Sequence, residues 1–143
     1  MRIALVSTPW PLFNRPSIQL GSLKAFISDR LPEVKVDTFH LYLQVAAALG
    51  YPLYEEISQS AWLAEPLYAA LLYPEQLEAI ERFWNRRVSR TNHCKQLPFL
   101  ELCEKLSKCS KEILSAQDWA RYRLIGLSVC FSQLTSSIYF ITQ

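Results

Sequence analysis

The chain has little glycine and lacks the short motifs that identify common enzyme sites. Only three of its 143 residues are glycine. A glycine-rich phosphate loop, a Gly-x-Ser-x-Gly elbow and a His-Glu-x-x-His zinc motif are all missing. The loop at residues 7–16 contains no glycine at all, which argues against a dinucleotide site of the Rossmann type. The sequence therefore gives no support for a free-standing catalyst of these classes.

The chain also has no large excess of positive or negative charge, and its apolar runs are short. The net charge of +2 is too small to predict a nucleic-acid or membrane partner. Glu, Gln, Pro or Arg interrupts every apolar run well before the roughly 20 residues of a membrane span. No signal-peptide pattern precedes the first apolar run, so we expect a cytoplasmic protein with reduced cysteines.

The cysteines match no zinc or iron–sulfur spacing. Cys94, Cys103 and Cys109 fit the core of a globular domain, where a free cysteine behaves as a small hydrophobe. Half of the residues are apolar, enough for a substantial core in one domain of 143 residues.

Three short runs predict strands of a parallel sheet. Residues 2–7 and 124–130 are aliphatic without alternation, as in strands covered on both faces. Residues 34–40 alternate and fit a position nearer an edge. Ser17 predicts the N-cap of an intervening helix. The apolar residues of this helix are Leu20, Leu23, Ile27 and Leu31.

Residues 41–121 predict helices only. Gly50 marks the end of one helix, and Pro74 and Pro98 mark the starts of two others. The buried faces of these two helices are predicted to contain Leu77, Ile80, Trp84 and Val88, and Phe99, Leu102, Leu106, Cys109 and Ile113. An ordinary crossover between parallel strands needs roughly a dozen residues. The segment is therefore a helical insert between the second and third strands.

The predicted fold class is α/β, with a partial parallel sheet in strand order 2-1-3. Ligands of such open sheets bind at the carboxyl ends of the strands, where the strand order reverses. The candidate site therefore lies after the first and third strands. Its candidate residues are Ser7, Thr8, Pro9, Ser17, Ser128, Val129, Cys130, Ser132, Gln133 and Thr135.

Residues 131–143 start a turn and a helix, which predicts that the chain breaks off before a fourth and a fifth strand. The third strand would then be an edge strand, although its sequence is suited to burial on both sides. An unpaired apolar edge invites pairing with another chain. We therefore expect self-association through this strand.

Several segments resemble one family. The run Ile125-Gly126-Leu127-Ser128 resembles the third strand of cobalamin-binding domains, which have a flavodoxin-like (Rossmann-like) fold. Residues 15–25, Arg15 to Ala25, resemble the N-terminal region of cobalamin-dependent radical S-adenosylmethionine proteins. Residues 49–55 and 125–136 are similar to one subgroup, the maturases of ribosomally made, post-translationally modified peptides (RiPP maturation). The resemblance covers nearly the whole chain.

The resemblance implies that residues 1–143 form the N-terminal part of a domain that holds cobalamin at the carboxyl edge of the sheet. The loop at residues 7–16 lacks the Asp-x-His-x-x-Gly motif, so no histidine of that loop would ligate the cobalt. Trp10, Leu12 and Phe13 are the apolar residues expected to cover the lower corrin face.

No CxxxCxxC motif occurs in the chain. The resemblance therefore implies that the iron–sulfur cluster and S-adenosylmethionine belong to a separate downstream barrel, whose substrate would be a peptide. We expect this chain by itself to be non-catalytic and bound cobalamin to be absent from it, because about half of the usual crevice is missing.

A non-catalytic interaction or dimerisation domain is the alternative. An exposed apolar patch on the insert, beside a crevice too narrow for a corrin, would favour it. Ser7 and Ser128 also fit a purely local role in satisfying backbone groups, and His40 and His93 fit capping roles. Gly21, inside a predicted helix, suggests a close backbone approach to the sheet or to a ligand.

A cluster of arginines lies on the helix that follows Pro74. It fits either a solvated helix face or a docking surface for an acidic peptide or other domains. Its members are Arg82, Arg86, Arg87 and Arg90.

Overall fold

Three parallel strands form a sheet in the predicted order in the computed structural model, which describes residues 1–143. The strands are β1 (Arg2–Ser7), β2 (Lys35–His40) and β3 (Leu124–Ser128). β1 lies in the centre and pairs in parallel with both neighbours. The predicted fold class, α/β with a partial flavodoxin-like sheet, is confirmed.

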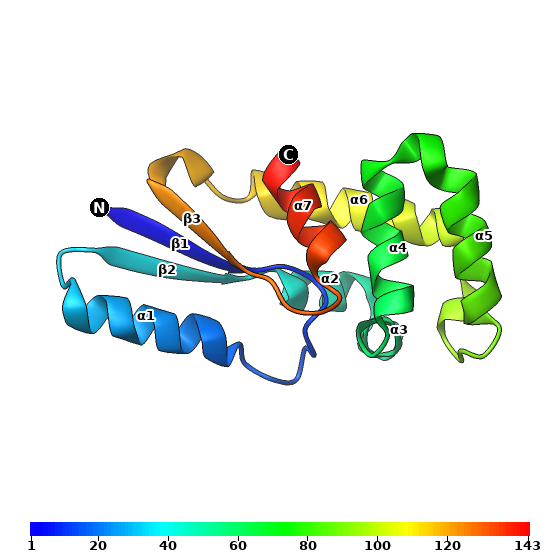
Figure 1. The fold of residues 1–143 in the computed structure, drawn as a ribbon, viewed down its shortest axis with the longest axis horizontal. Coiled ribbons are helices and arrows are strands. Elements are labelled where there is room, and N and C mark those ends of the chain that lie inside the picture. Colours follow the sequence, from blue (N-terminus) through cyan, green and yellow to red (C-terminus); the bar gives the residue numbers. More distant parts are fainter.

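Helices make up most of the remaining chain. α1 (Ile18–Arg30) connects β1 to β2, and α7 (Leu134–Thr142) follows β3. The insert contains α2 (Leu41–Leu49), α3 (Tyr51–Ser58), α4 (Ala61–Leu72), α5 (Leu77–Val88) and α6 (Phe99–Ser115). Figure 1 shows the sheet and α1 at one end of the molecule, and α3, α4 and α5 at the other. None of these helices combines the length and the apolar character needed to cross a membrane.

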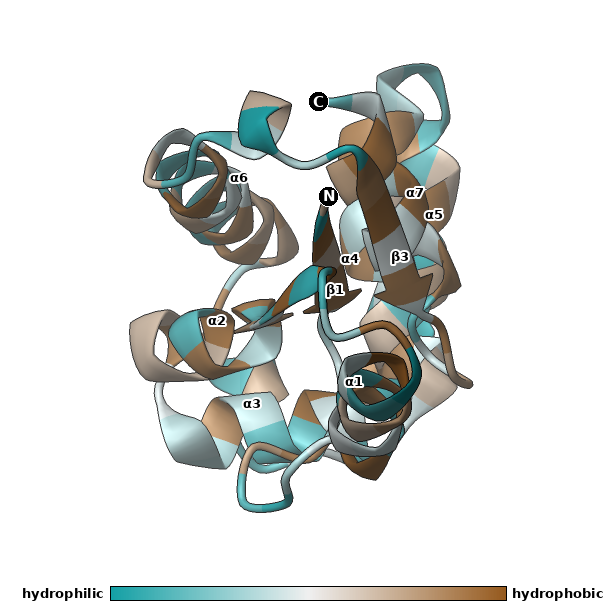
Figure 2. Ribbon diagram, turned by 90° about the vertical axis from the view of Figure 1, so that its left-hand side faces the viewer, coloured by the Kyte–Doolittle hydropathy of each residue, from teal (hydrophilic) through white to brown (hydrophobic).

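The two faces of the sheet belong to different cores, since successive side chains of a strand point to opposite faces. Ile3 and Leu5 of β1 pack with Leu20 of α1 in a small cluster. Ala4 and Val6 face the other way, into a cluster of 25 buried residues, most of which belong to the insert. Figure 2 shows hydrophobic residues concentrated on β1 and β3, whereas α1 presents residues of both kinds.

α1 begins as predicted but is less buried than its pattern suggests. The Ser17 hydroxyl accepts a hydrogen bond from the backbone N–H of Leu20 at 3.4 Å, which confirms the N-cap. Of the predicted apolar face, Leu20 is the one fully buried residue, and Leu23 remains 46% exposed. A Cβ added at Gly21 would meet nothing within 4 Å. The predicted close approach of Gly21 to the sheet is therefore wrong, because this part of the helix faces open space, and an approach to a ligand stays a prediction.

Most of the insert follows its sequence signals, but Trp84 is the one fully buried residue on the predicted buried face of α5. Gly50 has a positive φ of 88° where α2 ends, and the predicted buried face of α6 is buried throughout. The segment after Pro74 differs slightly, because residues 74–76 form a 3-10 turn before α5 begins. Tyr54, Tyr68 and Trp84 fill the interior, so the insert has a core of its own that is continuous with one face of the sheet.

Glu56 of α3 joins two distant parts of the insert. Its carboxylate accepts hydrogen bonds from three successive backbone N–H groups, those of Asn92 at 2.6 Å, His93 at 2.8 Å and Cys94 at 2.8 Å. These groups belong to the turn that connects α5 to α6. Nothing near Glu56 in the sequence reveals this partner.

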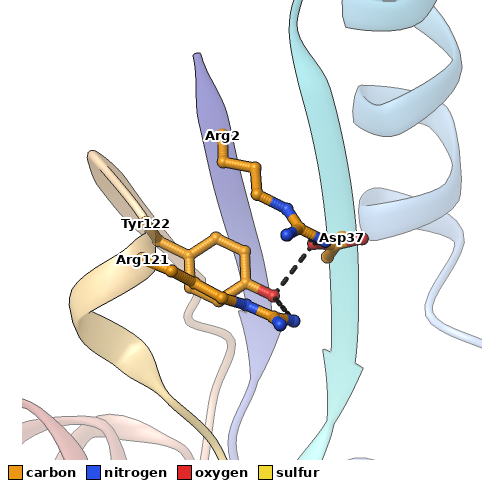
Figure 3. A network of polar contacts seen from close by, with 4 residues as sticks. All are labelled: Arg2, Asp37, Arg121 and Tyr122. Atoms are coloured by element: carbon orange, nitrogen blue, oxygen red, sulfur yellow. Dashed lines mark hydrogen bonds and ion pairs between the residues drawn. The ribbon is translucent and has the colours of Figure 1, made fainter.

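A polar network joins the three strands at the amino end of the sheet (Figure 3). Arg2 of β1 pairs with Asp37 of β2 at 3.1 Å, and the Tyr122 hydroxyl donates to the same carboxylate oxygen at 2.9 Å. Arg121 in turn donates to the Tyr122 hydroxyl at 2.6 Å. The hydrogen bond from Tyr122 and the charge of Arg2 outweigh burial and lower the pKa of Asp37. The network ties the start of β3 to β1 and β2, at the end of the sheet away from the predicted site.

Candidate functional site

A small recess lies at the carboxyl edge of the sheet, where β1 and β3 end side by side. Ser7 and Ser128 are partners in the strand register, so both strands stop at the same level. The recess has a volume of about 180 Å³. Of the ten predicted site residues, Ser7, Ser17, Ser128, Cys130 and Gln133 line it.

The Gln133 side chain joins the loop after β3 to the loop after β1 by hydrogen bonds. Its side-chain amide donates to the Thr8 carbonyl oxygen at 2.5 Å, and its side-chain oxygen accepts from the Cys130 backbone N–H at 2.9 Å. Gln133 and Thr8 are both buried. Their polar atoms thus pair with the protein itself and fix the shape of the recess.

The hydroxyl groups at the start of α7 also have internal partners. Thr8 and Ser137 share a hydrogen bond of 2.8 Å between their hydroxyl groups. The Ser136 hydroxyl donates to the Pro9 carbonyl oxygen, and Ser132 is buried with a positive φ of 76°. Thr8, Pro9 and Ser132 were predicted to contact a ligand, but none of them lines the recess, and Ser132 lines an apolar groove of the insert instead.

Glu65 of α4 caps α7 from the insert. Its carboxylate accepts the backbone N–H groups of Leu134 at 3.0 Å and Thr135 at 2.9 Å, and the Thr135 hydroxyl donates to the Glu65 carbonyl oxygen at 2.9 Å. A helix N-terminus is where an anionic ligand would otherwise bind. Thr135 was predicted to contact a ligand, but the Glu65 carboxylate already binds its backbone N–H group.

The apolar residues of the first loop divide between core and recess. Trp10 is buried, with its ring centre 5.2 Å from that of Tyr54 and 6.0 Å from that of Tyr68. Phe13 packs against Tyr51 at 4.6 Å, and Leu12 lines the recess. The prediction that Trp10 covers a corrin face is wrong in this structure, because aromatic residues of the insert enclose it.

Cysteine and histidine side chains do not gather at the recess. No three His, Cys, Asp or Glu side chains come together as a set of metal ligands. Burial raises the pKa of Cys94 and of Cys103 to about 12, so both are thiols at neutral pH. Cys130, in contrast, is exposed, and it lines the recess. His40 lies at the end of β2, where its ring packs edge-on against Tyr42.

Two residues that sequence reasoning missed complete the rim of the recess. Arg15 lines it from the loop before α1 and Gln19 from the first turn of α1, and the Gln19 side-chain amide lies 3.8 Å from the Cys130 sulfur. A ligand could contact these two residues together with Ser17, Ser128 and the half-exposed Val129. The signal for Arg15 was available, since it lies within the segment that carries the family resemblance.

The size of the recess limits what it can hold. Pockets that enclose a small molecule usually have volumes of about 300–1,000 Å³. At about 180 Å³, this recess can take one polar arm of a larger ligand, while the rest of that ligand would lie across the rim.

Comparison of the chain with protein-family models, curated proteins and solved structures gives no match.

Proposed function

We propose that this chain is a cobalamin-binding-type module of a radical S-adenosylmethionine enzyme that methylates or otherwise modifies a peptide. The strand order carries the proposal, because it puts a recess at the carboxyl edge between β1 and β3, where open α/β sheets bind their ligands. The family resemblance of residues 15–25 and 125–128 supports it independently. Two of those residues, Arg15 and Ser128, line the recess.

The residues at the rim fit the periphery of a corrin, which carries amide side chains. Arg15 offers hydrogen-bond donors, while Ser17, Gln19 and Ser128 offer donors and acceptors. No histidine lines the recess, so the cofactor would be held without an imidazole from these residues. When bound, cobalamin supplies a methyl group for transfer. The part of this chain is to bind and orient the ring through its amide arms, with Leu12 as an apolar contact.

In this proposal the radical chemistry, with its iron–sulfur cluster and S-adenosylmethionine, belongs to a separate barrel that acts together with this module. The exposed side of β3 is the natural place for such a partner, since its outer edge is unpaired in the sheet.

A titration with hydroxocobalamin, followed by amide resonances in solution, tests the proposal and detects weak binding. We expect the shifts to concentrate at Ser7, Ser17, Ser128 and Cys130. Ser128→Trp, which fills the recess, should abolish these shifts, and Ser22→Trp on the exposed face of α1 should leave them unchanged. A folded protein with no shifts at the recess at millimolar hydroxocobalamin would contradict the proposal.

A second candidate function is an interaction domain, and one observation favours it. The recess at the carboxyl edge is narrow, while the insert has an apolar groove of about 810 Å³. The sheet also presents a free edge, because Leu124 and Ile125 of β3 are 55% and 41% exposed. Beside Ile125, an apolar hollow of about 670 Å³ lies between the sheet, α6 and α7. Such an edge is a template for another strand.

If this second function holds, the protein will self-associate through β3. Two copies related by a two-fold axis would pair their β3 strands and bury both edges. Light scattering should show a molecular mass that rises with concentration, and Ile125→Lys should restore the monomer. Ile18→Lys, at an even more exposed site on α1, is the control and should not change the mass. A strict monomer at high concentration would count against this function.

A further inference from the structure

The helical insert contains an apolar groove, which we call the α4–α5 groove. It lies between α4, α5 and the loop that follows β3, and has a volume of about 810 Å³. Its apolar wall is formed by Trp62, Pro66, Ala69, Ile80, Phe83 and Leu134. Trp62 is 64% exposed and Leu134 60% exposed. Large apolar side chains gathered on one surface in this way mark an interaction site more often than a structural one.

Polar groups within the groove offer little to a ligand. Glu65 lies at its floor, but its carboxylate already accepts two backbone N–H groups at the start of α7. Gln76, in the 3-10 turn before α5, and Ser132, in the loop after β3, are the other amide and hydroxyl side chains that line the groove. An occupant would therefore gain most of its binding energy from apolar side chains buried against the wall.

One end of the groove carries positive charge. The Arg87 guanidinium lies 3.4 Å from the ring centre of Phe83 and 5.4 Å from that of Trp62, so it covers the aromatic wall. Arg82 pairs with Glu78 at 3.8 Å, but no acidic side chain pairs with Arg86, Arg87 or Arg90. An occupant with an acidic end would complement these unpaired cations.

We propose that the α4–α5 groove binds a helical peptide segment with apolar side chains on one face and Asp or Glu at the end beside Arg87. The walls of the groove are helices and a loop, and no strand edge lines it. A bound peptide therefore finds no backbone ladder to join and must satisfy its own backbone, as a helix does.

The groove meets the carboxyl edge of the sheet. Cys130 and Phe131 line both the groove and the recess. A peptide in the groove would thus lie beside the edge to which we assign the cofactor. That the peptide is a substrate rests on the proposed function, whereas its binding in the groove does not.

A binding experiment without cobalamin tests this inference separately from the proposed function. The probe is a fluorescein-labelled amphipathic peptide of about four helical turns, with leucines on one face and glutamates in its terminal turns. A second peptide has lysine in place of each glutamate. By fluorescence anisotropy we expect the acidic peptide to bind, and the lysine peptide to bind about tenfold more weakly at low salt, with the difference shrinking as salt is added. The indole N–H resonance of Trp62 should shift with the acidic peptide.

Charge-reversed variants locate the binding site. The double variant Arg86→Glu with Arg87→Glu should reverse the preference between the two peptides. Lys108→Glu with Lys111→Glu, at exposed positions of α6, changes the net charge equally and should leave the preference as it was. Equal binding of both peptides, an unmoved Trp62 resonance, or binding to phosphatidylglycerol vesicles but to neither peptide would each overturn the inference.

Discussion

Trp10→Ala is expected to lower the free energy of unfolding by about 3–5 kcal/mol, because it removes a large side chain from a well-packed interior. Trp10 lies in the loop after β1, yet it is only 2% exposed and packs among the aromatic side chains of Tyr54 and Tyr68. It is thus the residue that anchors the edge of the sheet in the insert. Denaturation by urea, followed by circular dichroism, measures the effect.

Two matched variants separate packing from polarity. The indole nitrogen of Trp10 is buried without a hydrogen-bond partner, and an unpaired buried donor costs about 1–3 kcal/mol. Trp10→Phe keeps an aromatic ring and removes that donor, so it should destabilise the protein much less than Trp10→Ala. Trp62→Ala, at an exposed position, should change stability by about 0.5 kcal/mol or less. Equal effects of Trp10→Ala and Trp62→Ala would contradict the anchoring role.

Glu56→Gln is expected to lower the free energy of unfolding by about 1–3 kcal/mol at neutral pH, since it removes the charged acceptor of three backbone N–H groups. Burial acts to raise the pKa of Glu56, but the N–H groups of Asn92, Cys94 and His93 outweigh it and lower the pKa from 4.5 to about 2. In the unfolded chain the carboxyl titrates near its ordinary value. Its contribution to stability is therefore complete above pH 4.5 and is lost as the pH falls toward 2.

Urea denaturation at a series of pH values tests whether the charged carboxylate of Glu56 is the source of this stability. Between pH 6 and pH 3 the wild-type protein should lose more stability than Glu56→Gln, which lacks the titrating group. The neighbouring Glu55 makes no side-chain hydrogen bond with the turn after α5, so Glu55→Gln should follow the wild-type curve. Parallel curves for wild type and Glu56→Gln would show that the three N–H groups do not stabilise the charged carboxylate.

Local signals in the sequence predicted most of the fold. The three apolar runs became the three strands, Ser17 caps α1, Gly50 ends α2 and the apolar face of α6 is buried. These features depend on hydrophobic periodicity and on capping by residues a few positions away. The prediction for α1 was weaker for the same reason. The spacing of Leu23 within the apolar pattern predicts a helix. It cannot show how much of that helix the sheet covers, and this narrow sheet covers only a small part.

At the candidate site, the sequence predicted which strand ends lie side by side. It did not predict which side chains at those ends are hydrogen-bonded within the protein. Ser7 and Ser128 meet at the recess because their strands are adjacent. Thr8 and Gln133, also predicted as ligand contacts, are instead hydrogen-bonded to each other's loops. A hydroxyl or amide at the end of a strand is compatible with both roles, and only its neighbours in space decide between them.

The sequence by itself thus determined where the strands and most of the helices lie and the presence of a helical insert, since these follow from patterns within a few turns of chain. The expected strand order 2-1-3 depends on the pairing of strands far apart in the sequence, which the structure supplies. Only the tertiary structure decided which polar groups remain free. The Gln133 amide meets Thr8 across 125 positions in the sequence, and the Glu65 carboxylate meets the backbone of Leu134 across 69. A buried polar group must find a partner, and when that partner is distant in the sequence no local pattern reveals it. The Glu65 contact also holds the start of α7 against α4, at the side of the α4–α5 groove that Leu134 lines.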